Sequence, residues 1–256
     1  MSGIELYVIH PGGVSASCWS RLASHLPPGT PIRVQELDTV NAYWANDPAL
    51  TVTAIADRLQ SALRPARRVL VGWGVGGAVA EALGARSAMR PQRVVALDSL
   101  APGVRDETPT EHTLLRSFAM YCGARRGRRL LIDPARLQDG LEPALDHIRE
   151  AAAAAGALRS DTTPEAVRRC YDDHARRLTR DFRLTARHTP SGLPLTVVKA
   201  TGSLAPESRA LGWDRYGPVE VLAAAGDHYT MLTDPASAPN LAVLLSRWLS
   251  PLSRAA

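Results

Sequence analysis

The chain between residues 68 and 83 reads Arg68-Val69-Leu70-Val71-Gly72-Trp73-Gly74-Val75-Gly76-Gly77-Ala78-Val79-Ala80-Glu81-Ala82-Leu83. A short apolar run is followed by a cluster of glycines and then by an alanine-rich segment, which indicates a strand, a sharp turn and a helix. This is the local geometry of a nucleophile elbow, in which the middle residue of Gly-x-Ser-x-Gly sits at the top of a parallel strand. Here the middle residue is Gly74, which has no side chain. The frame of a covalent hydrolase is therefore predicted without its attacking atom.

The same glycines also permit a phosphate-binding turn. Glycines between a strand and a helix occur in dinucleotide-binding folds, and a Gly-x-Gly-x-x-Gly pattern that starts at Gly72 ends correctly at Gly77. The spacing within this segment does not distinguish the two interpretations, so the rest of the chain has to.

The composition is that of an ordinary globular protein. The chain has 256 residues, of which 45% are hydrophobic and 21% charged, enough for one large α/β domain or two small ones. The formal net charge of +5 predicts a mildly basic surface that would attract an acidic partner protein. Only 5% of residues are aromatic and no basic stripe is interleaved with them, which argues against nucleic-acid binding.

The cysteines and the first residues of the sequence are used to predict the cellular compartment of the protein. Cys18, Cys122 and Cys170 are widely spaced and odd in number, so they fit neither a disulfide framework nor a zinc site. Reduced thiols in a cytoplasmic protein are expected. The segment from Met1 runs straight into an apparent strand, and no apolar span is long enough to cross a membrane. We expect a cytoplasmic monomer with no metal and no membrane association.

Apolar runs alternate with helical patterns along most of the chain. The predicted strands cover residues 4–10, 31–37, 69–71, 93–99, 195–200 and 219–223, and the predicted helices cover residues 50–63, 78–85 and 239–249. Such alternation implies a parallel sheet, whose ligands bind beyond the carboxyl ends of the strands. Asp98 lies at such an end.

The first predicted strand leads into a glycine turn, His10-Pro11-Gly12-Gly13-Val14-Ser15. Such a turn can aim free backbone N–H groups into a cleft, which suits an oxyanion. A tight connection to a helix that starts near Ser15 or Ser17 is the alternative interpretation.

Residues 104–190 lack a clear strand pattern. We interpret this segment as a helical insertion over the cleft within a single domain of residues 1–256, because it has too few periodic strands to form a second α/β domain. It contains an alanine run at residues 151–155 and the basic cluster at residues 125–129. That cluster is interpreted as a solvated face or as a contact for phosphate or an acidic partner.

The order of the candidate groups is characteristic. The elbow comes first, Asp98 follows at the next strand end, and His228 lies in a late predicted loop at residues 226–232. Nucleophile, acid and histidine occur in this order in α/β hydrolases, where the acid orients the imidazole and the imidazole moves protons.

At this point the sequence resembles a known family, the thioesterases of polyketide and nonribosomal peptide assembly lines, particularly the free-standing editing type. The resemblance covers nearly the whole chain and removes the dinucleotide interpretation. The motifs that carry it are His10-Pro11-Gly12-Gly13, Gly72-Trp73-Gly74-Val75-Gly76-Gly77, Leu97-Asp98-Ser99, Gly212-Trp213 and Gly226-Asp227-His228-Tyr229.

The resemblance implies an α/β-hydrolase fold, a mostly parallel sheet flanked by helices, with residues 104–190 in the place of the family's helical lid. It implies that His228 is the general base, and that Asp98 orients it. Asp227 is a rival acid, but its adjacency to His228 points its side chain elsewhere. The resemblance also implies a substrate, an acyl or peptidyl chain on the phosphopantetheine arm of a carrier protein, and no cofactor of the enzyme's own.

The oxyanion hole that the resemblance implies is made by backbone. The N–H of Val75 would form it together with the N–H of Gly12 or Gly13.

The departure from the family falls on the nucleophile. Loss of the serine from such a triad costs on the order of 10⁶ in turnover, so hydrolysis through an acyl-enzyme is not expected. Four explanations remain: a nucleophile-free mechanism in which His228 activates water or a group of the substrate at Gly74; a pseudo-thioesterase that only binds; replacement of the nucleophile by Cys18 or Ser99; and an engineered inactive variant of a serine enzyme.

Overall fold

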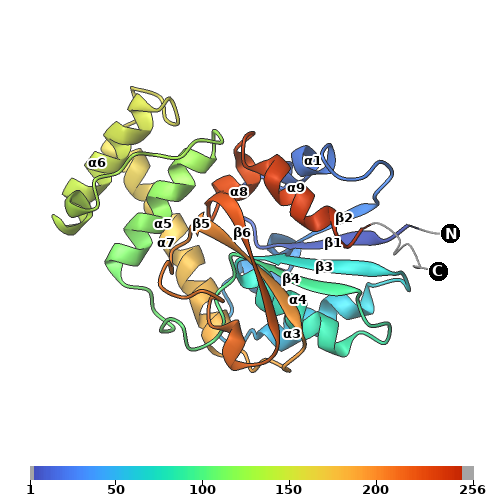
Figure 1. Cartoon of the computed structure of the whole chain (residues 1–256). Helices are drawn as coiled ribbons and strands as arrows, with labels where there is room; N and C mark the ends of the chain where they lie inside the picture. Colours follow the sequence, from blue (N-terminus) through green and yellow to red (C-terminus); the bar gives the residue numbers. More distant parts are fainter. Residues whose placement is uncertain (1–2, 250–256) are drawn as a thin grey trace.

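The computed structural model describes residues 3–249, and these form one sheet of six parallel strands (Figure 1). The strand order is β2-β1-β3-β4-β5-β6. The strands are β1 (Glu5–His10), β2 (Ile32–Glu36), β3 (Arg68–Trp73), β4 (Arg93–Leu97), β5 (Leu195–Gly202) and β6 (Val219–Asp227). Residues 1–2 and 250–256, which the predicted single domain includes, lie outside the described residues.

All six predicted strands are found, but one predicted loop is wrong. Residues 226–232 were expected to form a loop, whereas Gly226 and Asp227 belong to β6 and residues 230–232 to helix α8 (Thr230–Thr233). The physical reason is pairing: β6 remains beside β5 as far as Gly202 opposite Asp227, so its ladder outlasts the apolar run that ends at Ala223. Only His228 and Tyr229 lie between the strand and the helix.

Helices cover both faces of the sheet (Figure 1). Successive side chains of a strand point to opposite faces, so Tyr7 and Ile9 belong to the core beneath α3 and α4, whereas Leu6 and Val8 belong to the core beneath α1 and α9. These helices are α1 (Cys18–Ala23), α3 (Val52–Ser61), α4 (Val75–Arg86) and α9 (Ala238–Ser246). None of the helices formed by residues 3–249 is long and apolar enough to cross a membrane.

Residues 104–190 contain helices and no strand. They form α5 (Glu111–Ala124), the short 3-10 helix η2 (Ala135–Gln138), α6 (Leu141–Ala154) and α7 (Pro164–Ala186). Phe118, Ile148 and Tyr171 help to build a small apolar core of their own between these helices. Because α7 also packs against α4, the insertion is joined to the helix that follows the elbow (Figure 1).

A buried carboxylate pins the end of the insertion to α4. Glu81 accepts a hydrogen bond from His188 Nε2 at 2.9 Å and one from the Ser191 backbone N–H at 2.8 Å, and the Ser191 hydroxyl donates a further one. Burial by itself raises the pKa of Glu81, but these hydrogen bonds from His188 and Ser191 outweigh it, so the pKa lies below its ordinary value of 4.5. The charged carboxylate is therefore the form that stabilises the fold.

Replacement of this carboxylate is expected to destabilise the protein in a pH-dependent way. The change Glu81→Gln should lower the free energy of unfolding at pH 7 by about 2–3 kcal/mol, because hydrogen bonds to a buried charge are lost. Since the folded-state pKa is lowered, the contribution is complete above pH 4.5 and is lost as the pH falls through the folded value. Urea unfolding at several pH values checks this. The exposed Glu150→Gln is the matched control, and a gap between wild type and Glu81→Gln that persists well below pH 4 would contradict the expectation.

Candidate active site

The elbow residue has a backbone conformation that residues with a side chain rarely adopt. Gly74 joins β3 to α4 with φ at +56° and ψ at −129°. A Cβ atom at this position would lie 3.4 Å from both Cε1 and Nε2 of His228 and 3.9 Å from Cγ of Pro11. These are van der Waals distances, so a small side chain would fit beside the imidazole. The backbone at Gly74 therefore has the conformation of a nucleophile elbow, and a small side chain would have room there.

Another glycine of the elbow is required by close packing. A Cβ atom at Gly72 would lie 1.9 Å from the carbonyl oxygen of Gly76. No side chain can be accommodated there, because the first turn of α4 crosses directly over the end of β3. The glycine pattern of this segment therefore follows from the strand-to-helix turn.

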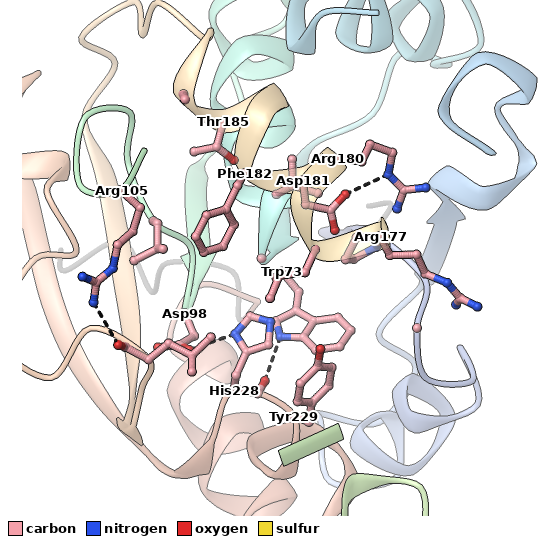
Figure 2. A pocket seen from close by; sticks show the side chains of 18 of the residues that line it. Trp73, Asp98, Arg105, Arg177, Arg180, Asp181, Phe182, Thr185, His228 and Tyr229 are labelled. Carbon is pink, nitrogen blue, oxygen red and sulfur yellow. Dashed lines mark hydrogen bonds and ion pairs between the residues drawn. The ribbon is translucent and has the colours of Figure 1, made fainter. Parts of the chain in front are cut away.

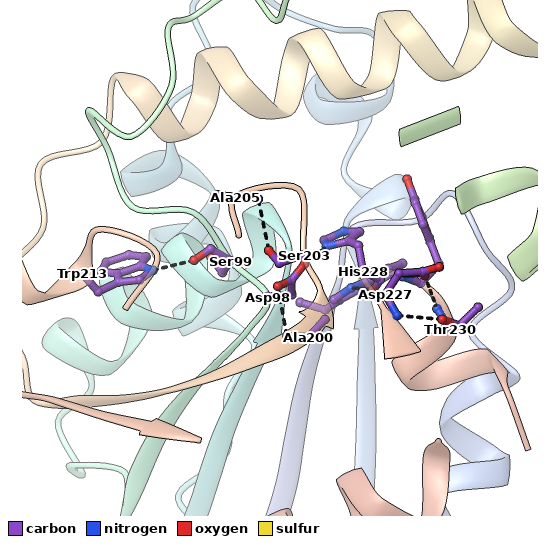
Figure 3. A network of polar contacts seen from close by, with 11 residues as sticks. Asp98, Ser99, Ala200, Ser203, Ala205, Trp213, Asp227, His228 and Thr230 are labelled. Carbon is purple, nitrogen blue, oxygen red and sulfur yellow. Dashed lines mark hydrogen bonds and ion pairs between the residues drawn. The ribbon is translucent and has the colours of Figure 1, made fainter. Parts of the chain in front are cut away.

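The predicted acid and histidine meet at the carboxyl ends of the strands. His228 Nδ1 lies 2.9 Å from Asp98 Oδ2, while Asp98 Oδ1 accepts a hydrogen bond from the Ala200 backbone N–H at 3.1 Å (Figure 3). Asp98 has φ at +40° and its side chain is only 2% exposed. The two bonds to Asp98 fix the carboxylate, which in turn orients the imidazole so that Nε2 faces Gly74.

The carboxylate of Asp227, next to His228 in the sequence, binds the backbone and forms no hydrogen bond with the imidazole. Asp227 Oδ1 accepts hydrogen bonds from the backbone N–H groups of Tyr229 and Thr230, at 3.0 and 2.9 Å. The Thr230 hydroxyl accepts one from the Asp227 N–H at 2.8 Å, so these two residues close the turn that enters α8. Asp227 is thus occupied by the backbone, and its side chain points away from the imidazole, as its adjacency to His228 predicted.

Trp73 contacts the histidine through its ring and through a hydrogen bond. Its ring stacks on that of His228, with 5.0 Å between centroids, and its Nε1–H donates to the His228 carbonyl oxygen at 2.9 Å (Figure 2). On its other side Trp73 stacks on His10, at 5.5 Å. The elbow tryptophan therefore positions both the short segment that carries His228 and the start of the glycine turn.

Loss of this support is expected to reduce turnover without unfolding the chain. The change Trp73→Phe keeps a ring in place but removes the hydrogen bond to the His228 carbonyl, which is worth about 1 kcal/mol. We expect kcat to fall roughly tenfold because the imidazole is held less firmly. Steady-state kinetics with the thioesters that the sequence resemblance implies check this. Trp248→Phe, outside the cavity, is the control, and an unchanged kcat for Trp73→Phe would contradict a positioning role.

His10 shapes the glycine turn. Its Nδ1 accepts from Trp19 Nε1–H at 3.2 Å, which leaves Nε2–H to donate to the Val14 carbonyl oxygen at 2.9 Å. Burial lowers the pKa of His10, so the neutral ring is favoured in this role. The turn between His10 and Val14 is closed by its own first residue.

The three predicted backbone donors border one cavity. Gly12 and Gly13 both have φ at +87°, and Val75 is the first residue of α4. A residue in the first helical turn has no carbonyl within the helix for its N–H to bond. Gly12, Gly13 and Val75 line the same cavity as Gly74 and His228. The arrangement can therefore present N–H groups to an oxygen that carries negative charge.

The cavity itself measures about 90 Å³ and has room for several water molecules (Figure 2). The glycine turn, the elbow and the segments after β4, β5 and β6 form one part of its wall, and α7 forms the other. The side chains that α7 contributes include His174, Arg177, Leu178, Arg180, Asp181, Phe182 and Thr185.

A cluster of residues that the sequence did not indicate joins α7 to the glycine turn. The hydroxyl of Tyr43, in the short helix α2 (Asn41–Trp44), lies 3.0 Å from the Pro11 carbonyl oxygen and 2.9 Å from Asp181 Oδ1. Arg180 Nε donates to Asp181 Oδ1 at 3.0 Å, and its guanidinium lies 3.5 Å from the centre of the Tyr43 ring. Burial raises the pKa of Asp181 against the lowering effect of Arg180.

A second unpredicted group is an aromatic layer beside the histidine. His174 stacks on Tyr121 with 5.0 Å between centroids, and Tyr229 lies edge-on to His228 at 4.9 Å. His174 Nε2 is 3.0 Å from the Ser117 hydroxyl. Burial, with Arg177 and His228 nearby, lowers the pKa of His174 to about 3, so this ring is neutral near pH 7. The spacing of Phe118 and Tyr121, and of Tyr171 and His174, three residues apart in each case, was the available sequence indication of this layer.

The other candidate nucleophiles lie outside the cavity. Cys18 is buried in α1, and burial raises the pKa of its thiol to about 12. Ser99 is fully buried with its hydroxyl against Gly77. Ser203 does line the cavity, but no hydrogen bond joins it to His228 within residues 3–249 (Figure 3). Among these same residues no group of three or more His, Cys, Asp or Glu side chains is placed to hold a metal ion.

Comparisons with known proteins identify the fold. No protein-family model matches the sequence, and no curated protein matches it either. Solved structures do match. The NocB thioesterase domain, in a covalent complex with a fluorophosphonate nocardicin G analog, aligns with a TM-score of 0.60 and 18% identity over 96% of this chain and 95% of that one.

Two further solved structures agree. RedJ, a thioesterase from the prodiginine biosynthetic pathway in Streptomyces coelicolor, gives a TM-score of 0.59 and 18% identity over 96% of this chain and 90% of that one. ClbQ from the colibactin NRPS/PKS pathway gives 0.54 and 14% over 96% of each chain. The chain therefore has the α/β-hydrolase fold of these proteins, and the predicted fold class is confirmed.

Proposed function

We propose that this protein is thioesterase-like and acts on acyl or peptidyl chains carried as phosphopantetheine thioesters in polyketide or nonribosomal peptide biosynthesis. The observation that carries the proposal is the pairing of His228 with Asp98 at 2.9 Å while its other nitrogen faces the open space at Gly74. A fold that had only a binding role would have no need of an oriented imidazole at this place. The solved structures with the same fold that are named as thioesterases support the same assignment.

In this proposal the reaction proceeds without an acyl-enzyme. A water molecule, or a hydroxyl or amine of the substrate, occupies the space beside Gly74 and gives its proton to His228 Nε2 as its heteroatom attacks the thioester carbonyl. The N–H groups of Val75 and of Gly12 or Gly13 stabilise the oxyanion. When the C–S bond breaks, His228 returns the proton to the pantetheine sulfur. Attack by water gives an acid, and attack by the substrate's own group gives a ring.

The helical insertion, residues 104–190, would act as a lid over the acyl chain. Its α7 side chains form one wall of the cavity, and Asp181 and Tyr43 link this helix to the glycine turn. The thioester arrives on a carrier protein, for which the net charge of +5 favours an acidic partner.

The experiment is turnover in isotopically labelled water. The protein is incubated with a panel of acyl-4′-phosphopantetheine thioesters in H₂¹⁸O, and products are identified by mass spectrometry. An acid that carries one ¹⁸O indicates attack by water, whereas a ring without ¹⁸O indicates attack by the substrate. Either product above the rate in buffer alone supports the proposal.

A binding role is the second candidate, and the backbone at Gly74 is the observation that favours it. With φ at +56°, glycine relieves a strain of about 1–3 kcal/mol that a serine would suffer here. A pseudo-thioesterase could therefore gain stability from losing its nucleophile. A protein that binds the thioesters but alters neither their rate of turnover nor their products would favour this role over catalysis.

A further inference from the structure

A second cavity adjoins the catalytic one, between α7 and the end of α2. It measures about 210 Å³, and its lining residues are Trp44, Asn46, Asp173, Arg176, Arg177 and Arg180. Arg177 and Arg180 also line the catalytic cavity, so the two spaces share a wall. Figure 2 shows both arginines extending from α7 to the same side of the catalytic cavity.

The two shared arginines have unused hydrogen-bonding capacity. Arg180 is 4% exposed; its Nε donates to Asp181 and its Nη1 to the Tyr43 carbonyl, but its buried Nη2 has no acceptor within residues 3–249. Arg177 is half-buried and forms no ion pair with any carboxylate of those residues. A buried guanidinium nitrogen without an acceptor costs free energy, which an oxygen of a ligand would recover.

The excess of positive charge around this second cavity favours an anionic ligand. Three arginines line it against one carboxylate, Asp173, which is already paired with Arg176. The exposed ring of Trp44 forms its outer edge, where 63% of that residue is accessible. Guanidinium groups match the geometry of phosphate oxygens, so the site is complementary to an anionic group.

We propose that Arg177 and Arg180 form a phosphate subsite at the entrance to the catalytic cavity, and that it binds the phosphate of a phosphopantetheine thioester. The inference rests on the proposed function, since it assigns the phosphate of the same substrate arm. The arm would pass between the two arginines and α2, with Trp44 at the edge, and lead its sulfur toward Gly74 and His228.

The test measures binding with two ligands that differ only in the phosphate. S-butyl-pantetheine and S-butyl-4′-phosphopantetheine are thioethers that cannot be hydrolysed, so their affinities are measured by calorimetry without interference from turnover. Inorganic phosphate alone is the third probe, followed by ³¹P NMR. The variant is Arg177→Gln, and Arg169→Gln, an exposed residue of the same helix outside both cavities, is the matched control.

We expect the phosphorylated thioether to bind roughly tenfold tighter than the other, because charge-assisted hydrogen bonds are added. Arg177→Gln should remove most of this difference, while Arg169→Gln should keep it. Equal affinities for the two thioethers, or a difference that survives Arg177→Gln, would overturn the subsite but leave the proposed function standing.

A third pattern would leave only a general anion site. Binding of inorganic phosphate that depends on Arg177, without binding of either thioether, would overturn both the assignment of this site to phosphopantetheine and the proposed function. Absence of binding by all three probes would overturn both.

Discussion

Gly74→Ser is expected to convert the protein into one that forms an acyl-enzyme. The Cβ position at residue 74 lies 3.4 Å from His228 Nε2, so a serine hydroxyl can reach that nitrogen with an ordinary rotamer. Removal of the serine from such a triad costs on the order of 10⁶, and we expect its introduction here to raise thioester hydrolysis by at least about 10³-fold. Turnover of acyl-4′-phosphopantetheine thioesters and covalent labelling by a fluorophosphonate, detected by intact-protein mass, check this.

The same variant should be less stable than the unaltered chain. A side chain at φ +56° adds about 1–3 kcal/mol of backbone strain. Gly74→Ala is the matched control, because it carries the strain but no hydroxyl; it should lose similar stability and show no labelling. If Gly74→Ser folds, binds the thioethers and yet neither reacts with the fluorophosphonate nor hydrolyses thioesters, the elbow geometry described above does not support nucleophilic attack.

Removal of the imidazole is expected to reduce turnover strongly in the protein with Gly74 unchanged. His228→Ala should lower kcat by about 10²–10⁴, the usual contribution of a general base. Asp98→Asn should also lower it strongly, because an amide in place of Oδ2 no longer holds the Nδ1–H tautomer that leaves Nε2 free to accept a proton. Rates with the thioester panel, together with the affinity for S-butyl-4′-phosphopantetheine, provide the measurement.

The neighbouring acid supplies the control. Asp227→Asn changes a carboxylate next to His228 in sequence whose oxygen serves the turn into α8, so it should affect stability more than kcat. Turnover that His228→Ala leaves unaffected would place the chemistry on another group. Loss of turnover in Asp227→Asn equal to that in Asp98→Asn would contradict the assignment of the orienting acid.

The sheet and the order of the candidate groups could be predicted because they depend on local pattern. Central parallel strands are buried on both faces, so they appear as short apolar runs, and all six were found. The carboxyl ends of such strands gather at one edge, which is why Asp98 and His228, 130 residues apart, meet there. The prediction of a loop at residues 226–232 was wrong, because pairing with β5 continues β6 past its apolar run. Such pairing is a nonlocal contact.

The amino-acid sequence by itself determined the strand-turn-helix elbow, the absence of a side chain at Gly74 and the chain order of Asp98 and His228. Only the tertiary structure decided that α7 forms the opposite wall, that Asp181 reaches Tyr43 across 138 residues, and that Arg177 and Arg180 separate two cavities. The reason is physical: an amphipathic helix pattern fixes which residues share a face, but the partner of that face is chosen by packing against segments distant in sequence.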